Sequence, residues 1–426
     1  MHDVFGNLPF HGADILLPKC GNMQKWSVVA CDQYTSQPEY WTRVADFVGD
    51  EPSSLHLILP ESRLEGPDVE ENIYEINQTM TRYLREELFV EYSNSVFYVE
   101  RRLDNGKVRR GLVGMVDLEQ YDYESGSAAL IRATEGTVLS RIPPRVAVRK
   151  NAPIELPHIM LLADDPQRTV IEPIGEQTAA MEKVYDFTLM ERGGHISGWK
   201  LNEEQMLHLA EALAVLADPA VFNERYQTRD LPTLLFAVGD GNHSLATAKE
   251  SYERQKKLIT PEKWESIPAR YALAELVNLH DDSLEFEAIH RVVFDADPKE
   301  LLTALLKTYA GAYIGRGEGH VIEYVCAGET GCVTVPTPSA QLPVGTLQNF
   351  LDRYLKEHGG RVDYIHGDDV TRKLGSQSGC IGFLLPAMSK EQLFPTVIHD
   401  GALPRKTFSM GEAHDKRFYL EARKIR

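Results

Sequence analysis

The stretch from Thr233 to Lys249, TLLFAVGDGNHSLATAK, constrains the fold more than any other part of this 426-residue chain. Its apolar run, Leu234 to Val238, predicts a buried strand. The run ends at a polar loop, GDGNH (239–243), after which apolar residues recur at helical spacing up to Tyr252. The sequence therefore predicts a strand, a tight loop and a helix in direct succession.

The residues of this loop suit both anion binding and catalysis. Gly239 and Gly241 let the backbone turn sharply and approach a ligand, and the helix start offers amides and a positive dipole end to phosphate or carboxylate. Asp240 could bind a metal ion or act as a base, and His243 could donate to a phosphate or take a proton. The plain alternative is a structural turn in which Asp240 or Asn242 caps the helix. The loop lacks the Gly-Lys-Ser/Thr of a P-loop and the third glycine of the dinucleotide-binding pattern.

Charge and composition narrow the class of protein. A hydrophobic fraction of 43% is enough for a sizeable core, and a formal net charge of -18 argues against binding to nucleic acid or to an anionic membrane. The five cysteines form no C-x-x-C pair, and the chain shows neither a signal-peptide pattern nor an apolar run of membrane-spanning length. We therefore expect a cytoplasmic protein that can still bind a small anion in a local pocket of arginines, with a homo-oligomer as an open alternative.

The order of predicted elements indicates the fold class. Val96 to Arg102, a turn at 104–106 and Val108 to Val116 predict a β-hairpin whose turn favours positive φ. Asn202 with Gln205 predicts a capping box at a helix start. Helices and strands mix without a strict βαβ rhythm, which favours an α+β or mixed α/β fold of mixed sheets with flanking helices. We expect one unit over residues 1–426, with a division into two lobes near 200–232 as the alternative.

A second candidate site lies upstream, in RATEGTVLSRIPPR (132–145). Arg132, Arg141 and Arg145 fall within fourteen residues, with Glu135, threonines and a serine between them. Arginine forks match phosphate and carboxylate oxygens bidentately. The alternative is a solvated loop whose arginines pair with the acidic protein's own carboxylates.

Three further segments carry candidate polar residues. Asp32 and Gln33 follow a short apolar run and so lie at a predicted strand end, although a capped turn explains them equally. Arg291 and Lys406 could add positive charge to an anion site. Their segments, and the charged stretch 414–417, are nevertheless more typical of surface or strand-edge groups.

Four motifs together resemble the bacterial domain-of-unknown-function-1015 family over nearly the whole chain. They are the strand-DGNH-helix box (236–248), WSVVACDQYTS (26–36), RATEGTVLSRIPPR (132–145) and LPRKTF (403–408). The family's central box, usually Asp-Gly-His-His-Arg, is similar to one in the ParB/sulfiredoxin superfamily, which includes partition proteins, sulfiredoxins and free-serine kinases. The resemblance implies a strand-loop-helix core of that kind, with phosphates bound at the helix start.

The residues of the box carry over in part. Asp240, Gly241 and His243 match the family's Asp, Gly and second His. Asn242 replaces the first His, and Ser244 replaces the Arg. The missing positive charge would have to come from elsewhere, with these candidates: Arg132, Arg141, Arg145 and Arg291.

The resemblance implies a phosphotransferase acting on a small hydroxyl metabolite, similar to a free-serine kinase. Asp240, His243 and Glu135 are its candidate catalytic residues, and Asp240 is also the candidate ligand of Mg²⁺. ATP, ADP or pyrophosphate would bind at the 240–245 loop with Gly241, Asn242 and Ser244, and no tightly bound cofactor is expected. A nucleotide-binding regulatory module without turnover and a metal-dependent hydrolase are the alternatives.

Overall fold

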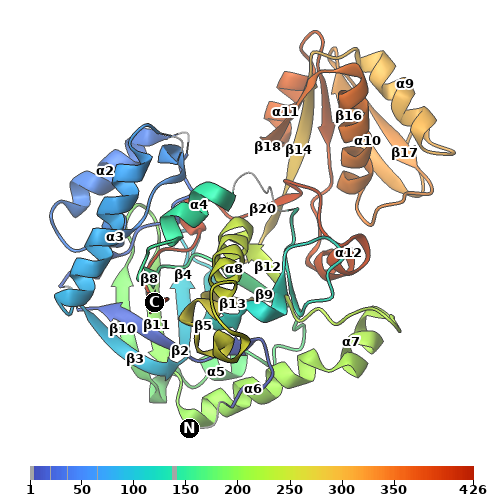
Figure 1. The fold of residues 1–426 in the computed structure, drawn as a ribbon. Helices are drawn as coiled ribbons and strands as arrows, with labels where there is room; N and C mark the ends of the chain where they lie inside the picture. The colour runs from blue at the N-terminus through green and yellow to red at the C-terminus, as the bar shows by residue number, and fades with distance from the viewer. Residues whose placement is uncertain (1–3, 20, 36, 65, 137–141) are drawn as a thin grey trace. The chain divides into compact units, whose positions relative to one another are not determined.

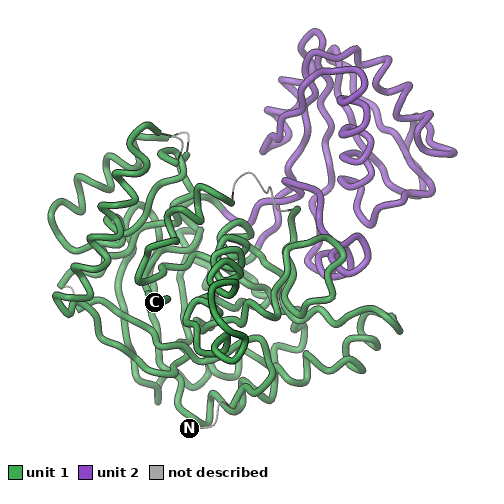
Figure 2. Tube along the Cα trace, viewed as in Figure 1, with its two compact units in different colours: residues 1–284, 412–426 green, residues 285–411 purple. Residues whose placement is uncertain are grey.

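The computed structural model describes residues 4–19, 21–35, 37–64, 66–136 and 142–426. The chain divides into two compact units (Figure 2). Unit 1 comprises Met1–Leu284 with Glu412–Arg426, and unit 2 comprises Glu285–Gly411. Helices and strands mix in both units, so the fold is mixed α/β, as the sequence predicts.

Unit 1 is built on a mixed sheet which, in the described residues, has ten strands. Their order is β10-β11-β4-β5-β13-β9-β12-β7-β6, with β1 beside β5. The strands are β1 (Phe10–His11), β4 (Phe97–Arg102), β5 (Val108–Asp117), β6 (Tyr121–Asp122), β7 (Ile131–Arg132), β9 (Met160–Ala163), β10 (Glu182–Thr188), β11 (His195–Lys200), β12 (Phe236–Asp240) and β13 (Tyr271–Asn278). β9 runs parallel to β13 and antiparallel to β12, and β12 runs parallel to β7.

The segment 200–232, the alternative domain boundary, lies inside unit 1. Strand β13 follows this segment in the chain but pairs with β5 and β9, which precede it. One sheet therefore spans the segment, and the divisions between the units fall at 284/285 and 411/412 instead.

Eight α-helices accompany this sheet in the described part of unit 1 (Figure 1). They are α1 (Met23–Trp26), α2 (Pro38–Val48), α3 (Val69–Arg85), α4 (Ile142–Arg149), α5 (Glu172–Gly175), α6 (Glu203–Ala217), α7 (Pro219–Tyr226) and α8 (Asn242–Lys256). Leu245, Ala248 and Tyr252 of α8 enter the same core as Phe236 and Val238 of β12. The apolar spacing thus buries one face of α8 against the sheet.

Two local predictions are confirmed in unit 1. β4 and β5 pair antiparallel from Phe97↔Val113 to Arg102↔Val108, and Gly106 in their turn has a φ of +83°. Asn202 and Gln205 form a complete capping box at the start of α6. Both depend on neighbours in the chain, which is why they are predictable from sequence.

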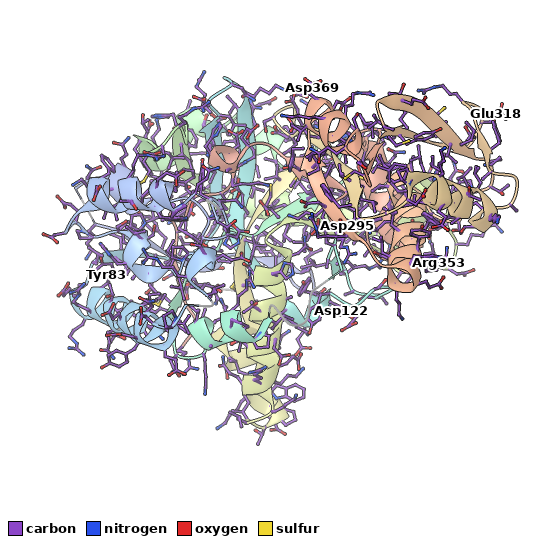
Figure 3. All side chains as sticks on the ribbon, turned by 90° about the horizontal axis from the view of Figure 1, so that it is seen from above. Tyr83, Asp122, Asp295, Glu318, Arg353 and Asp369 are labelled. Atoms are coloured by element: carbon purple, nitrogen blue, oxygen red, sulfur yellow. The ribbon has the colours of Figure 1, made fainter. Side chains whose placement is uncertain are left out.

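The C-terminal segment of unit 1 returns beside the 26–36 motif. Trp26 Nε1 donates to the carbonyl of Leu420 at 2.9 Å, and Tyr419 N donates to the carbonyl of Val28 at 2.8 Å. Trp26 packs against Tyr83 of α3, labelled in Figure 3. Two short sheets complete the unit: β2 (Ala13–Pro18) with β3 (Phe89–Ser95), and β8 (Ile154–Glu155) with β21 (Arg423–Lys424).

Unit 2 has a sheet of its own, with seven strands among the described residues. The order is β15-β17-β16-β19-β14-β18, with β20 beside β14. Its elements are β14 (Phe286–Phe294), β15 (Tyr313–Ile314), β16 (His320–Cys326), β17 (Glu329–Val335), β18 (Arg361–His366), β19 (Ile381–Leu384), β20 (Phe408–Met410), α9 (Pro298–Thr308), α10 (Pro343–His358), α11 (Asp368–Gly375) and α12 (Leu393–Asp400).

In the part of the chain that the structure describes, no single helix is long and apolar enough to cross a membrane. One bent pair, α6 with α7, passes by length and composition alone.

Tyr121 offers a test of core packing. Its side chain is 1% exposed, and its hydroxyl has no hydrogen-bond partner among the described residues. An unpaired buried hydroxyl costs about 1–3 kcal/mol. We therefore expect Tyr121→Phe to keep or raise the free energy of unfolding, measured by urea denaturation.

The matched control is Tyr185→Phe. The Tyr185 hydroxyl donates to Glu421 Oε1 at 2.6 Å in a buried setting, so its removal should lower the free energy of unfolding by about 1–3 kcal/mol. Equal losses in the two variants would contradict the expectation for Tyr121.

Candidate functional site

The predicted strand-loop-helix is present as β12, Gly241 and α8. Gly241 is the N-cap of α8 with a φ of +78°. A Cβ at this position would lie 3.1 Å from the Cα of Ile159. Gly241, rather than Asp240 or Asn242, is the cap, and because glycine has no side chain the cap residue offers no side-chain oxygen to the first amides of α8.

Gly241→Ala is expected to lower the free energy of unfolding by about 1–2 kcal/mol, because a Cβ makes positive φ costly. The tight approach to Ile159 adds to this cost. The control is Gly21→Ala, since a Cβ there would meet no atom within 4 Å. Thermal or urea unfolding that shows the two variants equally stable would contradict this account.

Asp240 forms an ion pair with a lysine from the C-terminal segment. Lys416 Nζ lies 3.2 Å from Asp240 Oδ2, and the two side chains are 16% and 24% exposed. The Gly241 amide donates to Asp240 Oδ1 at 2.9 Å. Burial raises the pKa of Asp240, but the positive charge of Lys416 is the strongest opposing influence, and the pKa lies below its usual value. The carboxylate is therefore ionised at neutral pH.

Buried arginines fix the segment that carries Lys416. Arg101 donates to the backbone carbonyls of 414, 415 and 416, and Arg109 Nη1 donates to that of Asp415 at 2.9 Å. Arg417 pairs with Glu275 at 2.8 Å and with Glu421 at 2.7 Å. The prediction of a surface charge group at 414–417 is thus wrong for Arg417, which is 5% exposed.

His158 joins the helix start to the 26–36 motif. Its Nε2 lies 3.1 Å from Ser244 Oγ and 3.8 Å from Asp32 Oδ2. Its Nδ1 lies 2.8 Å from the hydroxyl of Tyr419. Asp32 thus lies near the loop, and Gln33 Nε2 donates to Asp32 Oδ1 at 3.0 Å.

Asn242 joins the loop to the upstream arginine segment. Its Oδ1 accepts from the Thr134 amide at 3.1 Å, and its Nδ2 donates to Thr134 Oγ1 at 3.2 Å. Thr134 Oγ1 in turn donates to the Val238 carbonyl at 2.6 Å. The parallel pairing of β7 with β12 brings these segments together, and half-buried Glu135 follows directly.

The candidate arginines differ in their surroundings. Arg132 is buried and donates to the carbonyls of Ala129, Pro232 and Thr233, so it holds the entry to β12. Arg145 pairs with Glu61 at 2.6 Å, and Arg141 lies outside the described residues. Their part in anion binding stays a prediction.

Arg291 and Lys406 belong to unit 2. The Arg291 guanidinium donates to the carbonyls of Arg405 and Lys406 and to Gln348 Oε1. It therefore supports the LPRKTF motif of its own unit, and Lys406 there is exposed with a φ of +54°.

Sequence reasoning missed Lys416, His158 and Tyr419. In the sequence, Lys416 is only one of several charged residues. Its neighbours carry no pattern that predicts burial of the segment inside unit 1. His158 and Tyr419 lie in stretches without a recognisable motif, 86 residues before Ser244 and 175 after it respectively. Their convergence depends on the sheet pairing.

Across the described ranges, no group of three or more His, Cys, Asp or Glu side chains could hold a metal ion. Mg²⁺, however, often takes only one or two carboxylates together with substrate phosphates. Ionised Asp240 fits a magnesium ion of that kind.

The comparison with protein families decides the family of the chain. The family described as "Protein of unknown function (DUF1015)" matches residues 8–354. The chain belongs to this family. The match confirms the family that the motifs predict, although LPRKTF lies beyond the matched residues.

Several solved structures resemble this chain at low sequence identity. No curated protein matches it. Similar solved structures include a free serine kinase in complex with AMP (11% identity, TM-score 0.38, covering 73% of this chain and 91% of that chain). They also include a conserved hypothetical protein from Pyrococcus furiosus (11% identity, TM-score 0.36, covering 71% of this chain and 92% of that chain). A third is SbnI with a C-terminal truncation from Staphylococcus aureus (9% identity, TM-score 0.37, covering 70% of this chain and 82% of that chain).

Proposed function

We propose that unit 1 binds a phosphate donor at the start of α8 and transfers a phosphoryl group to the hydroxyl of a small metabolite. One observation carries this proposal: Lys416 and ionised Asp240 face each other beside helix amides that the N-cap residue leaves uncapped. Phosphoryl transfer needs positioning and charge stabilisation more than covalent chemistry from the protein. A cation, a carboxylate and a helix start supply those needs.

Lys416 would hold the phosphates of the donor. Its ammonium is a compact charge that suits a phosphate oxygen, and the buried arginines keep its backbone in place. It also takes over the positive charge that the family's box places at position 244, where this chain has serine.

Asp240 would act in its ionised form. A bound Mg²⁺ would neutralise charge on the donor phosphates, with Asp240 as its protein ligand. The lowered pKa of Asp240 favours this role over that of a proton acceptor, because a weakly basic carboxylate holds a proton poorly.

In the transfer, the bond from phosphorus to the donor oxygen breaks and a bond to the metabolite oxygen forms. The leaving oxygen of the donor keeps the electron pair of the broken bond, and the metabolite hydroxyl would give its proton to His243 or Glu135. His243 in the first turn of α8 and Glu135 beside Thr134 are the candidates for contact with the reacting groups, as the sequence predicts.

The test is a substrate panel with the full chain. ATP, ADP or pyrophosphate with Mg²⁺ is incubated with serine and related hydroxy compounds, and products are followed by ³¹P NMR. A phosphorylated metabolite that requires Asp240, judged by Asp240→Asn, is the expected result. Asp186→Asn, at an exposed site of unit 1, is the control and should remain active.

Two other outcomes would overturn the proposal. Tight nucleotide binding in calorimetry without product over hours would identify a regulatory module without turnover. Failure of the folded protein to bind any of the three donors would remove the phosphate site itself.

A further inference from the structure

A chain of hydrogen bonds leads from the backbone of residue 31 to Ser244. The Cys31 amide lies 3.2 Å from the Tyr419 hydroxyl, which lies 2.8 Å from His158 Nδ1. His158 Nε2 lies 3.1 Å from Ser244 Oγ. His158 and Tyr419 are both buried, so these hydrogen bonds are shielded from solvent as far as Ser244.

The first bond of this chain has a fixed direction. A backbone amide can only donate, so the Tyr419 oxygen accepts from Cys31. Burial raises the pKa of Tyr419, so its hydroxyl keeps its hydrogen and needs an acceptor.

Two atoms compete for that hydrogen, His158 Nδ1 and the Cys31 sulfur. Burial, helped by Asp32, raises the pKa of Cys31 to about 12, so the sulfur remains a neutral thiol. A thiol sulfur is a weak acceptor, whereas an imidazole nitrogen is a good one. Tyr419 therefore donates to His158 Nδ1.

The tautomer of His158 follows. With Nδ1 as the acceptor, the neutral ring carries its hydrogen on Nε2. Asp32 Oδ2, 3.8 Å from Nε2, favours a hydrogen on that side of the ring. His158 thus donates to Ser244 Oγ.

Ser244 is left with a hydrogen to donate. Among the described residues, its Oγ has one hydrogen-bond partner, His158 Nε2. Since that bond uses Oγ as the acceptor, the O–H points to a second group. A group that carries only acceptors, such as an unprotonated phosphate oxygen, complements it.

We infer that His158 and Tyr419 are positioning residues that fix Ser244 as a hydrogen-bond donor to an unprotonated phosphate oxygen at the start of α8. The ligand in this statement rests on the proposed function, whereas the direction of the bonds does not. The same direction excludes His158 as a general base toward Ser244, because Nε2 already holds a hydrogen.

The direction of the bonds is tested by ¹⁵N NMR of the full chain with labelled histidine at pH 8. We expect the His158 ring to show an unprotonated Nδ1 and a protonated Nε2. Tyr419→Phe removes the donor to Nδ1 and should raise the share of the Nδ1–H tautomer. A wild-type ring in the Nδ1–H form, or a ratio unchanged in Tyr419→Phe, would overturn the inference.

The donor role of Ser244 is tested by calorimetric titration with pyrophosphate and Mg²⁺. Ser244→Ala should weaken binding about tenfold, while Ser244→Thr, which keeps a hydroxyl, should stay within about threefold of wild type. Wild-type affinity in Ser244→Ala would overturn this inference and leave the proposed function standing. If the wild type binds neither pyrophosphate nor ADP, the proposed function and the donor role of Ser244 are both overturned.

Discussion

Replacing Lys416 with methionine is expected to lower the rate of phosphoryl transfer about 10²- to 10³-fold, because it removes a fixed positive charge from the donor phosphates. The substitution also removes the largest influence that lowers the pKa of Asp240, so that pKa should rise. Steady-state kinetics with the substrate pair found active would measure the rate, and ¹³C NMR of labelled aspartate would follow Asp240.

The matched control is Lys424→Met in the same C-terminal segment. Lys424 is 51% exposed and pairs with Glu91, so its loss should leave the rate close to that of the wild type. If Lys416→Met stays folded and turns over like Lys424→Met, the donor phosphates are not held by Lys416.

Arg417→Met is expected to lower the free energy of unfolding by about 3–5 kcal/mol, because it leaves Glu275 and Glu421 without their common cation. These three side chains are at most 6% exposed, so water cannot replace the lost partner. Urea denaturation at pH 7 would measure the change. Lys183→Met breaks an exposed pair with Asp186 and should cost less than about 1 kcal/mol. Similar losses of unfolding free energy in the two variants would show that the buried ion pairs stabilise the protein no more than the exposed pair does.

The same network predicts a dependence of stability on pH. Burial raises the pKa of Glu275, but Arg109 and Arg417 outweigh burial and lower it. A lowered folded-state pKa gives stability that is complete above the unfolded value of about 4.3 and is lost as the pH falls through the folded value. In Arg417→Met the folded-state pKa of Glu275 should rise toward the unfolded value, so the acid-dependent loss of stability that Glu275 contributes should be smaller and should end at a higher pH than in the wild type.

The sequence predicted best those features that neighbouring residues determine. The hairpin of β4 and β5 follows from alternating apolar residues around Gly106, and the capping box of α6 follows from Asn202 and Gln205. The family followed from motifs that lie within short stretches of chain. In contrast, the absence of a boundary near 200–232 depends on β13 pairing with β5 and β9 across that segment, which no local pattern reports.

The candidate site shows the same division. The sequence by itself determined that a strand, a glycine turn and a helix start present Asp240, because local spacing and glycine's access to positive φ suffice for that. Only the tertiary structure decided which groups meet it: Lys416 is 176 residues away, His158 is 82, and buried arginines hold the segment that carries the lysine. Contacts between such distant residues follow from strand pairing and buried charge, and neither leaves a periodic signal in a single sequence.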